Sequence, residues 1–262
     1  MRAILTGRIV SKLRRIFSSR IGSQTFVLVM LIGAWEIVGR SVQSPLLPPL
    51  TAILTAWSDL IFAQAFQRDL GISLATMATG FLLALVSGIS LGILMARYPA
   101  VERLLDPYMN ALMSSPITAL VPIIMLVFGS QFTARVVIVF LFSFFAICIN
   151  TLTGVKNADR ALVEMVRSFG ARERQVTTIV ALPGALPIIL QGVRLSIARA
   201  VGGVLIAELM MALSGLGYQL STYGAAFLTN YVYAIVGTIT LIAWLLSELV
   251  RLLERRLTYW NA

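Results

Sequence analysis

The sequence contains no histidine and a single cysteine, Cys148, among its 262 residues. Zinc and other soft metals are bound by histidine and cysteine side chains, so this composition leaves no ligand set for such a site. One cysteine cannot form a disulfide within the chain, and its place inside an apolar stretch is typical of a small buried hydrophobic side chain. We therefore expect that neither a metal nor a disulfide organises this protein.

Charge is also scarce. Charged residues make up 12% of the chain, whereas a soluble domain contains about 25%. Hydrophobic residues make up 58%, and the mean hydropathy is +0.90. The net charge of +10 does not indicate nucleic-acid binding, because the basic residues are spread between apolar stretches rather than gathered in one patch. The composition predicts an all-α, polytopic membrane protein.

Six apolar stretches are long enough, with some flanking residues, to approach the ~20 residues that a helix needs to cross a bilayer. They cover roughly residues 21–39, 71–96, 107–128, 136–152, 187–213 and 231–247. The segment 44–69 lies between the first two and opens with three prolines. We expect a short surface helix at residues 51–62 within it.

Lysine and arginine are distributed unequally between the segments that join these stretches. With the N-terminus inside, the segments on that side hold sixteen of them, and those on the other side hold Arg40, Arg68 and Arg135. This predicts an inner-membrane protein with both termini and residues 153–187 in the cytoplasm, and residues 214–230 outside. We expect residues 1–20 to form an uncleaved basic cytoplasmic segment and residues 21–262 to form a single transmembrane domain.

No nucleotide-binding motif of the form G-x-x-x-x-G-K-[ST] is present. The chain is therefore not expected to hydrolyse ATP, and a transporter of this kind would draw energy from another chain or from a gradient. A gradient-driven carrier needs ionisable residues within the membrane, and the candidates are Arg194, Arg199, Glu208, Glu36 and Glu248, the last two near the ends of apolar stretches. An intramembrane enzyme is disfavoured, because histidine is absent and aspartate is expected only in loops.

The segment 159–187 is the longest charged interval between apolar stretches. Apolar residues there recur at helical spacing, with polar residues on the opposite face: Leu162, Met165, Val166 and Phe169 against Arg160, Glu164, Arg167 and Ser168. Asp159 is a good N-cap and Gly170 a good C′ residue, and Pro183 and Pro187 are expected to break the following helix. A helix about 15 Å long cannot span a bilayer, so it either packs under its own bundle or presents its polar face to a partner.

The spacing of Glu164, Gly170 and Leu182–Pro183 resembles the EAA loop of ABC-importer permeases, with Met165 and Val166 in place of the two alanines. The resemblance continues through residues 44–54, 80–112, 182–209 and 214–218 and covers roughly residues 40–260. These segments are similar to permeases for sulfonates, taurine, nitrate and related small anions.

The resemblance implies a type I ABC importer fold, with about six transmembrane helices and a cytoplasmic coupling helix in residues 153–187. It implies a homodimer in the membrane lipid, two separate ATPase subunits that use ATP and magnesium, and a periplasmic or lipid-anchored binding protein. The implied function is import of a small anion by alternating access, without a cofactor or nucleic acid bound by this chain. The residues expected to contact the ATPase are Glu164, Arg167, Gly170, Ala171, Leu182 and Pro183. A secondary carrier leaves this loop unexplained, and exporter halves usually carry a fused ATPase.

The fifth apolar stretch and the two prolines of the third supply candidates for a translocation pathway. Arg194 and Arg199 either extend to the inner interface or line a path for an anion, and Glu208 either pairs with an arginine or shapes a gate. Pro116 and Pro122 either kink a packed helix or break one that lines the pathway. A stripe of small residues favours close helix packing, either within the chain or across a dimer axis: Gly192, Ser196, Ala200, Gly203 and Ala207.

Overall fold

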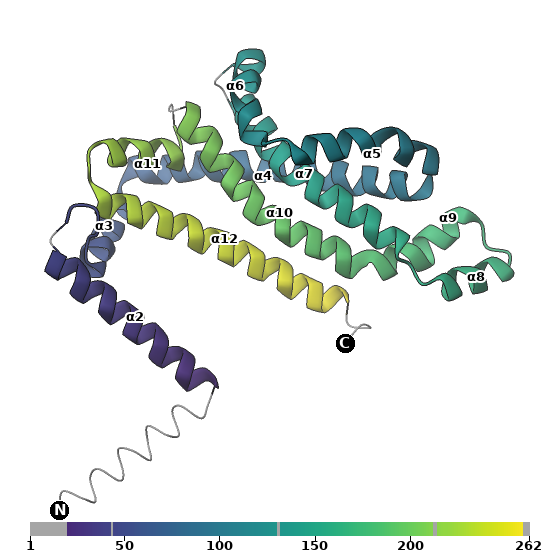
Figure 1. Cartoon of the computed structure of the whole chain (residues 1–262), viewed down its shortest axis with the longest axis horizontal. Helices are drawn as coiled ribbons and strands as arrows, with labels where there is room; N and C mark the ends of the chain where they lie inside the picture. Colours follow the sequence, from purple (N-terminus) through teal and green to yellow (C-terminus); the bar gives the residue numbers. More distant parts are fainter. Residues whose placement is uncertain (1–19, 43, 130–131, 212–213, 259–262) are drawn as a thin grey trace, which may run out of the picture. The chain divides into compact units, whose positions relative to one another are not determined.

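The computed structural model describes residues 20–42, 44–129, 132–211 and 214–258, and all their regular structure is helical (Figure 1). The elements are α2 (Arg20–Val42), α3 (Leu50–Phe62), α4 (Gln64–Arg97), α5 (Pro99–Ser114), α6 (Ile117–Phe128), α7 (Phe132–Lys156), α8 (Arg160–Ser168), α9 (Glu173–Gln175), a π-helical turn η1 (Val176–Ala181), α10 (Leu182–Met211), α11 (Leu216–Ala225) and α12 (Thr229–Leu257). This confirms the predicted all-α class. Apart from the backbone of Arg20, the basic segment predicted at residues 1–20 lies outside the described residues.

Five helical segments are long and apolar enough to cross a membrane: residues 24–42, α4, α7, residues 173–211 and α12. A sixth is obtained if α5 and α6, which are bent by 101° at their junction, count as one crossing. The third predicted apolar stretch, residues 107–128, is therefore two helices with a bend between them. Pro116 lies at this bend as the N-cap of α6, whereas Pro122 lies inside that helix. Pro122 has no N–H to donate to the Thr118 carbonyl, yet α6 continues through it to Phe128.

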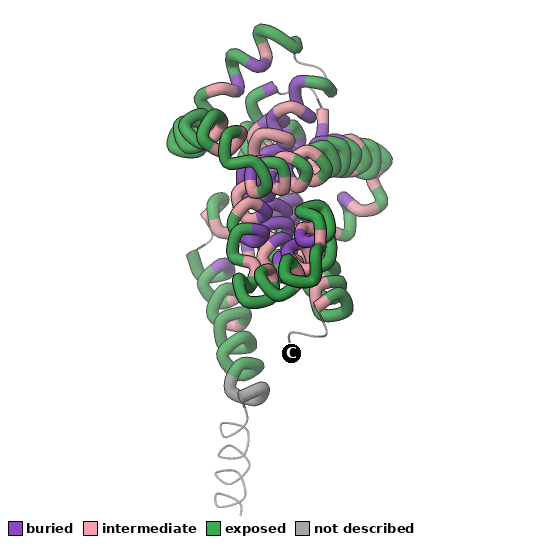
Figure 2. The backbone as a smooth tube through the Cα atoms, turned by 90° about the vertical axis from the view of Figure 1, so that its right-hand side faces the viewer, coloured by how far each residue is buried: buried purple, intermediate pink, exposed green. Residues whose placement is uncertain are grey.

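Contacts divide the chain into two compact units, residues 1–61 with 223–234 and residues 62–222 with 235–262. In the first, α2 is exposed along most of its length (Figure 2), and only 6% of its membrane-length segment is buried.

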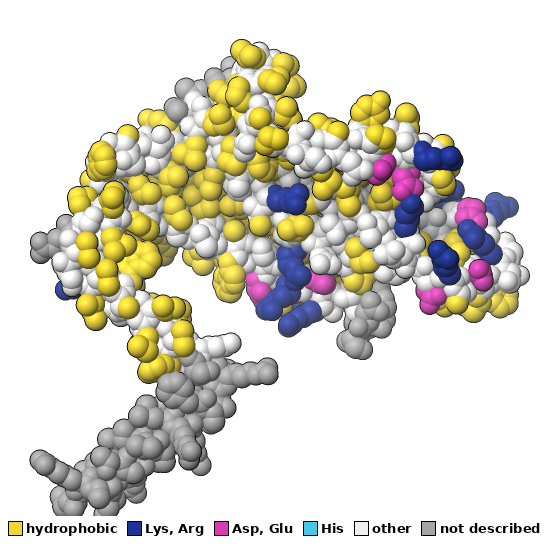
Figure 3. Space-filling view, in the orientation of Figure 1, with side chains coloured by type: hydrophobic (Ala, Val, Ile, Leu, Met, Phe, Trp, Pro, Cys, Tyr) yellow, Lys and Arg dark blue, Asp and Glu magenta, His cyan; other side chains and the backbone are white. Residues whose placement is uncertain are grey.

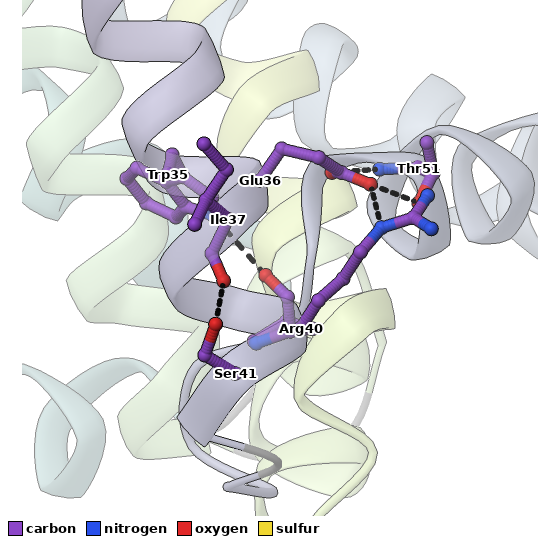
Figure 4. A network of polar contacts seen from close by, with 7 residues as sticks. Trp35, Glu36, Ile37, Arg40, Ser41 and Thr51 are labelled. Atoms are coloured by element: carbon purple, nitrogen blue, oxygen red, sulfur yellow. Dashed lines mark hydrogen bonds and ion pairs between the residues drawn. The ribbon is translucent and has the colours of Figure 1, made fainter.

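A polar network joins α2 to the start of α3 (Figure 4): the Glu36 carboxylate accepts from the backbone N–H of Thr51 at 3.1 Å and from Arg40 at 2.6 Å. Trp35 Nε1 donates to the Pro48 carbonyl at 3.1 Å. Glu36 therefore caps α3 and fixes the proline-rich turn.

In the second unit α7 is the central helix, with 56% of its membrane-length segment buried. Glycines on α4 allow it to lie very close to α7. A β-carbon added at Gly80 would lie 2.7 Å from Val139 Cβ, and one added at Gly92 would lie 2.6 Å from the Cys148 carbonyl oxygen. Small residues at the contact allow backbones to approach in the way typical of membrane helices.

The small-residue stripe of α10 also packs against α7. A β-carbon at Gly192 would lie 2.5 Å from Asn150 Cβ, and one at Gly203 would lie 3.1 Å from Phe142 Cβ. Ser196 Oγ donates to the Ser143 carbonyl at 3.1 Å. All five residues of the stripe are buried within the chain, so the structure supports intrachain packing rather than a contact across a dimer axis.

The expectation that Pro183 and Pro187 break the helix is wrong. α9, η1 and α10 follow one another without interruption over residues 173–211, and Pro187 lies inside α10. The π turn absorbs the first proline: the Leu182 N–H reaches back five residues to the Thr177 carbonyl. This wider turn relieves the clash between a proline ring and the carbonyl four residues earlier, which would otherwise kink the helix.

Candidate functional site

The short helix α8 begins at the predicted cap. The Asp159 carboxylate accepts a hydrogen bond from the backbone N–H of Ala161 at 2.8 Å, and the helix then runs from Arg160 to Ser168. An aspartate at this position satisfies one of the free N–H groups of the first turn and places negative charge at the positive end of the helix dipole. This confirms the N-cap assignment made from the sequence.

The end of α8 is set by Gly170, whose φ is +80°. The Gly170 N–H donates to the Arg167 carbonyl at 2.9 Å, and the Ala171 N–H donates to the Val166 carbonyl at 3.3 Å. These two bonds form a Schellman motif, in which a left-handed residue ends the helix and turns the chain sharply. The predicted C′ role of Gly170 is confirmed, and no other atom lies within 4 Å of a β-carbon added there, so only the backbone conformation requires glycine.

The turn that follows is closed by side chains. Arg167 makes a two-pronged contact with Glu173, at 2.9 Å from Nε and 3.1 Å from Nη2. This hydrogen bond raises the pKa of Arg167 above its usual range. The Gln175 amide oxygen accepts from the backbone N–H of Arg172 at 2.8 Å. Both members of the Arg167–Glu173 pair are more than half exposed, so the pair defines the angle of the turn more than it stabilises the fold.

No residue of α8 is buried within the described chain. On its apolar face Leu162 and Met165 are exposed, and Phe169, just beyond the helix, is 84% exposed. On the polar face Glu164 and Arg167 border a hollow that Arg97, Lys156 and Glu173 also line. This end of the unit carries basic and acidic side chains together (Figure 3). Both faces of α8 are therefore accessible in the part of the chain that the structure describes.

The residues predicted to contact an ATPase fall into two groups, one on α8 and the turn after it and one where the loop joins the bundle. Glu164, Arg167 and Gly170 are exposed on α8 and its end, and Ala171 is half-buried. Leu182 and Pro183 are half-buried where the loop joins the bundle, and Leu182 packs on a core cluster that includes Val155 and Ala185. The structure thus connects α8, through the turn at residues 169–172, to the uninterrupted helical segment of residues 173–211.

The predicted pathway residues on α10 fall in different environments. Arg194 is half-buried and lies 3.6 Å from Glu254 of α12. Arg199 is exposed and makes no hydrogen bond or ion pair with any described residue. Unpaired arginine facing lipid is costly, so this position requires protein or water beside it.

Glu208 does not line an open path in this structure. Its side chain is 0% exposed. The Ser73 hydroxyl lies 2.7 and 2.8 Å from its two carboxylate oxygens, and the Gly217 N–H donates to Oε2 at 2.9 Å. No ion pair links Glu208 to an arginine within the part of the chain that the structure describes. Of the two alternatives for Glu208, pairing with an arginine or shaping a gate, the first is not what the structure shows: the carboxyl group accepts from a hydroxyl and a backbone N–H instead.

Sequence reasoning missed three residues of this neighbourhood. Asp69 was expected in a loop but lies in α4, as Asp59 lies in α3 and Asp106 in α5. Arg135 was counted as a charge of an outer loop, yet it is buried in the first turn of α7 and donates to Ser214. Ser73 lies within an apolar stretch without any local signal. The available signal was the pair of glycines at 215 and 217, which leave space for a neighbouring side chain.

The described residues thus form five helices that are long and apolar enough to cross a membrane, or six with the bent pair, and an exposed, doubly capped loop. The profile of the family described as "Binding-protein-dependent transport system inner membrane component" matches residues 88–259, and the chain belongs to this family. It is a permease subunit of an ABC importer and an inner-membrane protein.

Individual relatives and solved structures agree with this class. The chain is 35% identical to "Putative aliphatic sulfonates transport permease protein SsuC" of Bacillus subtilis (strain 168), over 88% of this chain and 85% of the relative. It is 32% identical to "Taurine transport system permease protein TauC" of Escherichia coli (strain K12), over 89% and 87% of the two chains. A solved amino acid ABC transporter shares the fold, with a TM-score of 0.63 at 18% identity over 76% of this chain and 97% of that one.

Proposed function

We propose that this permease imports a small sulfonate-type anion. The observation that carries this proposal is identity of 32–35% across almost the whole chain to three relatives named for aliphatic sulfonates or taurine. A relative from Halalkalibacterium halodurans named for formylaminopyrimidine transport is 33% identical over 90% of this chain. The test must therefore separate an anionic sulfonate from a neutral pyrimidine.

The working unit in this proposal is a homodimer of the permease with two ATPase subunits and a substrate-binding protein. ATP and magnesium belong to the ATPase subunits, and this chain binds no cofactor. Both termini and residues 153–187 lie in the cytoplasm, and residues 214–230 face the periplasm, in agreement with the distribution of lysine and arginine. Transport follows alternating access, in which ATP binding shifts the bundle between inward- and outward-facing states.

The ATPase contact is the exposed tip of α8. Glu164 and Arg167 supply charge there, and Leu162, Met165 and Phe169 supply apolar surface that would otherwise face water. The caps at Asp159 and Gly170 and the ion pair of Arg167 with Glu173 hold this tip at a fixed angle. A rigid tip on a helical path that continues through residues 173–211 can transmit the movement of an ATPase to α10.

Arg199 is the residue that we assign to the pathway with most support. It lies on a spanning helix, is exposed, and lacks a partner among the described residues. A cation in such a position attracts an anion into a region of low dielectric. Arg194 is a weaker candidate because Glu254 already neutralises it. Pro116 lies at the bend between α5 and α6, and Pro122 lies within α6 beyond it.

The test uses the complete importer in proteoliposomes, with radiolabelled taurine and with unlabelled ethanesulfonate or formylaminopyrimidine as competitors. We expect ATP-dependent taurine uptake that ethanesulfonate reduces, that formylaminopyrimidine leaves unchanged, and that an uncoupler does not abolish. Arg199→Met should lower uptake without reducing recovery of the ATPase on copurification. Competition by formylaminopyrimidine alone would contradict the anion assignment, and uptake driven by a proton gradient without ATP would contradict the importer mechanism.

A further inference from the structure

The turn at residues 214–219, which leads from α10 into α11, is held by hydrogen bonds to side chains of other helices. Gly215 in this turn has φ of +99°. Three helices that are far apart in the sequence bind it. It contacts α4 through Asp69 and Ser73, α7 through Arg135, and α10 through Glu208.

The contacts follow the turn residue by residue. Arg135 Nη1 donates to the carbonyl and hydroxyl oxygens of Ser214 at 3.2 and 3.1 Å. The next three backbone N–H groups donate in turn to Asp69 Oδ1 at 3.0 Å, Ser73 Oγ at 2.9 Å and Glu208 Oε2 at 2.9 Å. The Gln219 amide then donates to Asp69 Oδ2 at 2.6 Å.

The turn supplies hydrogen-bond donors to two carboxyl groups. The recorded partners of both carboxylates are donors: two N–H groups for Asp69, and one N–H and one hydroxyl for Glu208. The two backbone donors lie at the start of α11: Gly215 is the residue before the helix, and Gly217 is in its first turn. There N–H groups lack partners within the helix, and the dipole favours negative charge. A buried carboxylate is tolerated only when such bonds replace its hydration.

The fit around Glu208 requires the two glycines. A β-carbon at Gly215 would lie 2.3 Å from Glu208 Cδ, and one at Gly217 would lie 2.6 Å from Glu208 Cβ. The backbone of the turn therefore lies directly against the glutamate side chain. This close approach excludes a solute from Glu208 in this conformation.

We infer that Asp69, Ser73, Arg135 and Glu208 form a clasp that fixes the start of α11 to α4, α7 and α10, and that these four are positioning residues of the transport cycle. The clasp links the start of α11 to the N-terminal part of α4, to the first turn of α7 and to the last turn of α10. The inference rests on the proposed function, which places this turn on the periplasmic side. There a rigid α11 sets the geometry of the outer mouth, while Glu208 itself touches no substrate.

The first test measures amide hydrogen exchange over residues 214–219 in the complete importer in lipid nanodiscs. Glu208→Gln keeps the shape of the side chain but replaces one acceptor oxygen with a donor, and Ser73→Ala removes the acceptor for Leu216. We expect exchange in this segment to become about tenfold faster in either variant, because a hydrogen bond to a charged or buried group is lost. The matched control is Glu248→Gln, which makes the same change in a partly exposed pair with Arg251 and should leave this exchange unchanged.

The second measurement is the number of ATP molecules hydrolysed per taurine imported. Both clasp variants should raise this ratio by lowering uptake more than ATP hydrolysis, with normal recovery of the ATPase subunits. Unchanged exchange in Glu208→Gln and Ser73→Ala would overturn the clasp. Faster exchange with a wild-type ratio would overturn its positioning role. If the wild-type importer moves no taurine, the proposed substrate fails, whereas the exchange measurement still decides the clasp.

Discussion

Charged residues organise both ends of α10, but in opposite ways. Before α10, the α8 loop holds its charges in water: Arg167 and Glu173 pair while 51% and 64% exposed. At the end of α10, the clasp holds Glu208 at 0% exposure, and its carboxyl group accepts from Ser73 and from a backbone N–H rather than from an arginine. The first region remains free to meet another protein. In the second, both carboxyl groups accept hydrogen bonds from donors of the same chain, whereas Arg135 Nε and Gln219 Oε1 are buried without a partner among the described residues.

The comparison indicates that the exposed pair of Arg167 and Glu173 sets the shape of a turn, whereas the hydrogen bonds of buried Glu208 matter for stability. An exposed pair loses little hydration and returns little free energy, about 0–1 kcal/mol. A buried carboxylate loses its hydration entirely, so each donor around it is required, and removing one leaves a costly unsatisfied group. Substitutions at the clasp should therefore cost stability, and those at the α8 loop should cost coupling.

The largest effect is expected for Gly215→Ala. A β-carbon there meets the Glu208 carboxyl group at 2.3 Å, and φ is +99°. The strain and the displaced hydrogen bonds should together cost roughly 3 kcal/mol and lower the midpoint of thermal unfolding in detergent by several degrees. Gly224→Ala in α11 is the control, because nothing lies within 4 Å of its added β-carbon. Equal midpoints in the two variants would refute the packing described for the clasp.

A smaller effect on stability, with a large effect on transport, is expected for Gly170→Ala. The added β-carbon meets no atom within 4 Å but must adopt φ of +80°, which costs about 1 kcal/mol. The turn should open and tilt α8, so that ATP-driven uptake falls while insertion and dimerisation are retained. Gly184→Ala, which is equally open but helical, should transport normally. Wild-type uptake in Gly170→Ala would show that the angle of α8 is unimportant.

Charge reversal at Glu164 should change coupling with almost no change in stability. Glu164 is exposed and lysine has a similar helix propensity. In Glu164→Lys we expect substrate-stimulated ATP hydrolysis to be lost while the unfolding midpoint stays unchanged. Asp59→Lys on exposed α3 is the control for charge alone. Suppressors of Glu164→Lys should map to the ATPase subunit, and suppressors confined to this chain would argue against a contact there.

A small loss of stability is expected for Arg167→Gln, which breaks the exposed ion pair with Glu173. Its free energy of unfolding should fall by less than about 1 kcal/mol, as measured by chemical denaturation of the solubilised protein. Glu208→Gln, measured beside it, should lose more, because its partners are buried. A larger loss of unfolding free energy in Arg167→Gln than in Glu208→Gln would contradict the proposed difference between the two ends of α10.

Local features of the sequence were sufficient to predict the α8 loop. The N-cap at Asp159 and the left-handed Gly170 depend on residues within one or two turns of each other, so spacing and residue type identified them. The apolar stretches likewise predicted the spanning helices, because length and hydropathy are properties of each segment alone. The continuation of the helix past Pro183 was missed, because a π turn that accommodates a proline leaves no clear pattern in the sequence.

Only the tertiary structure decided what surrounds the polar residues inside the bundle. Spacing showed that Gly192 and Gly203 share one face of a helix, but α7 as the neighbour became evident only from the packing. From the sequence, Arg135 and Asp69 were expected to be charges in loops. In the folded chain Arg135 binds Ser214, 79 residues away, and Asp69 binds Gly215, 146 residues away. The physical reason is that hydrogen bonds of a buried carboxylate are made with whatever donors the fold brings near. The sequence by itself therefore determined the class of protein and its coupling loop, and the fold determined that Glu208 holds a helix in place.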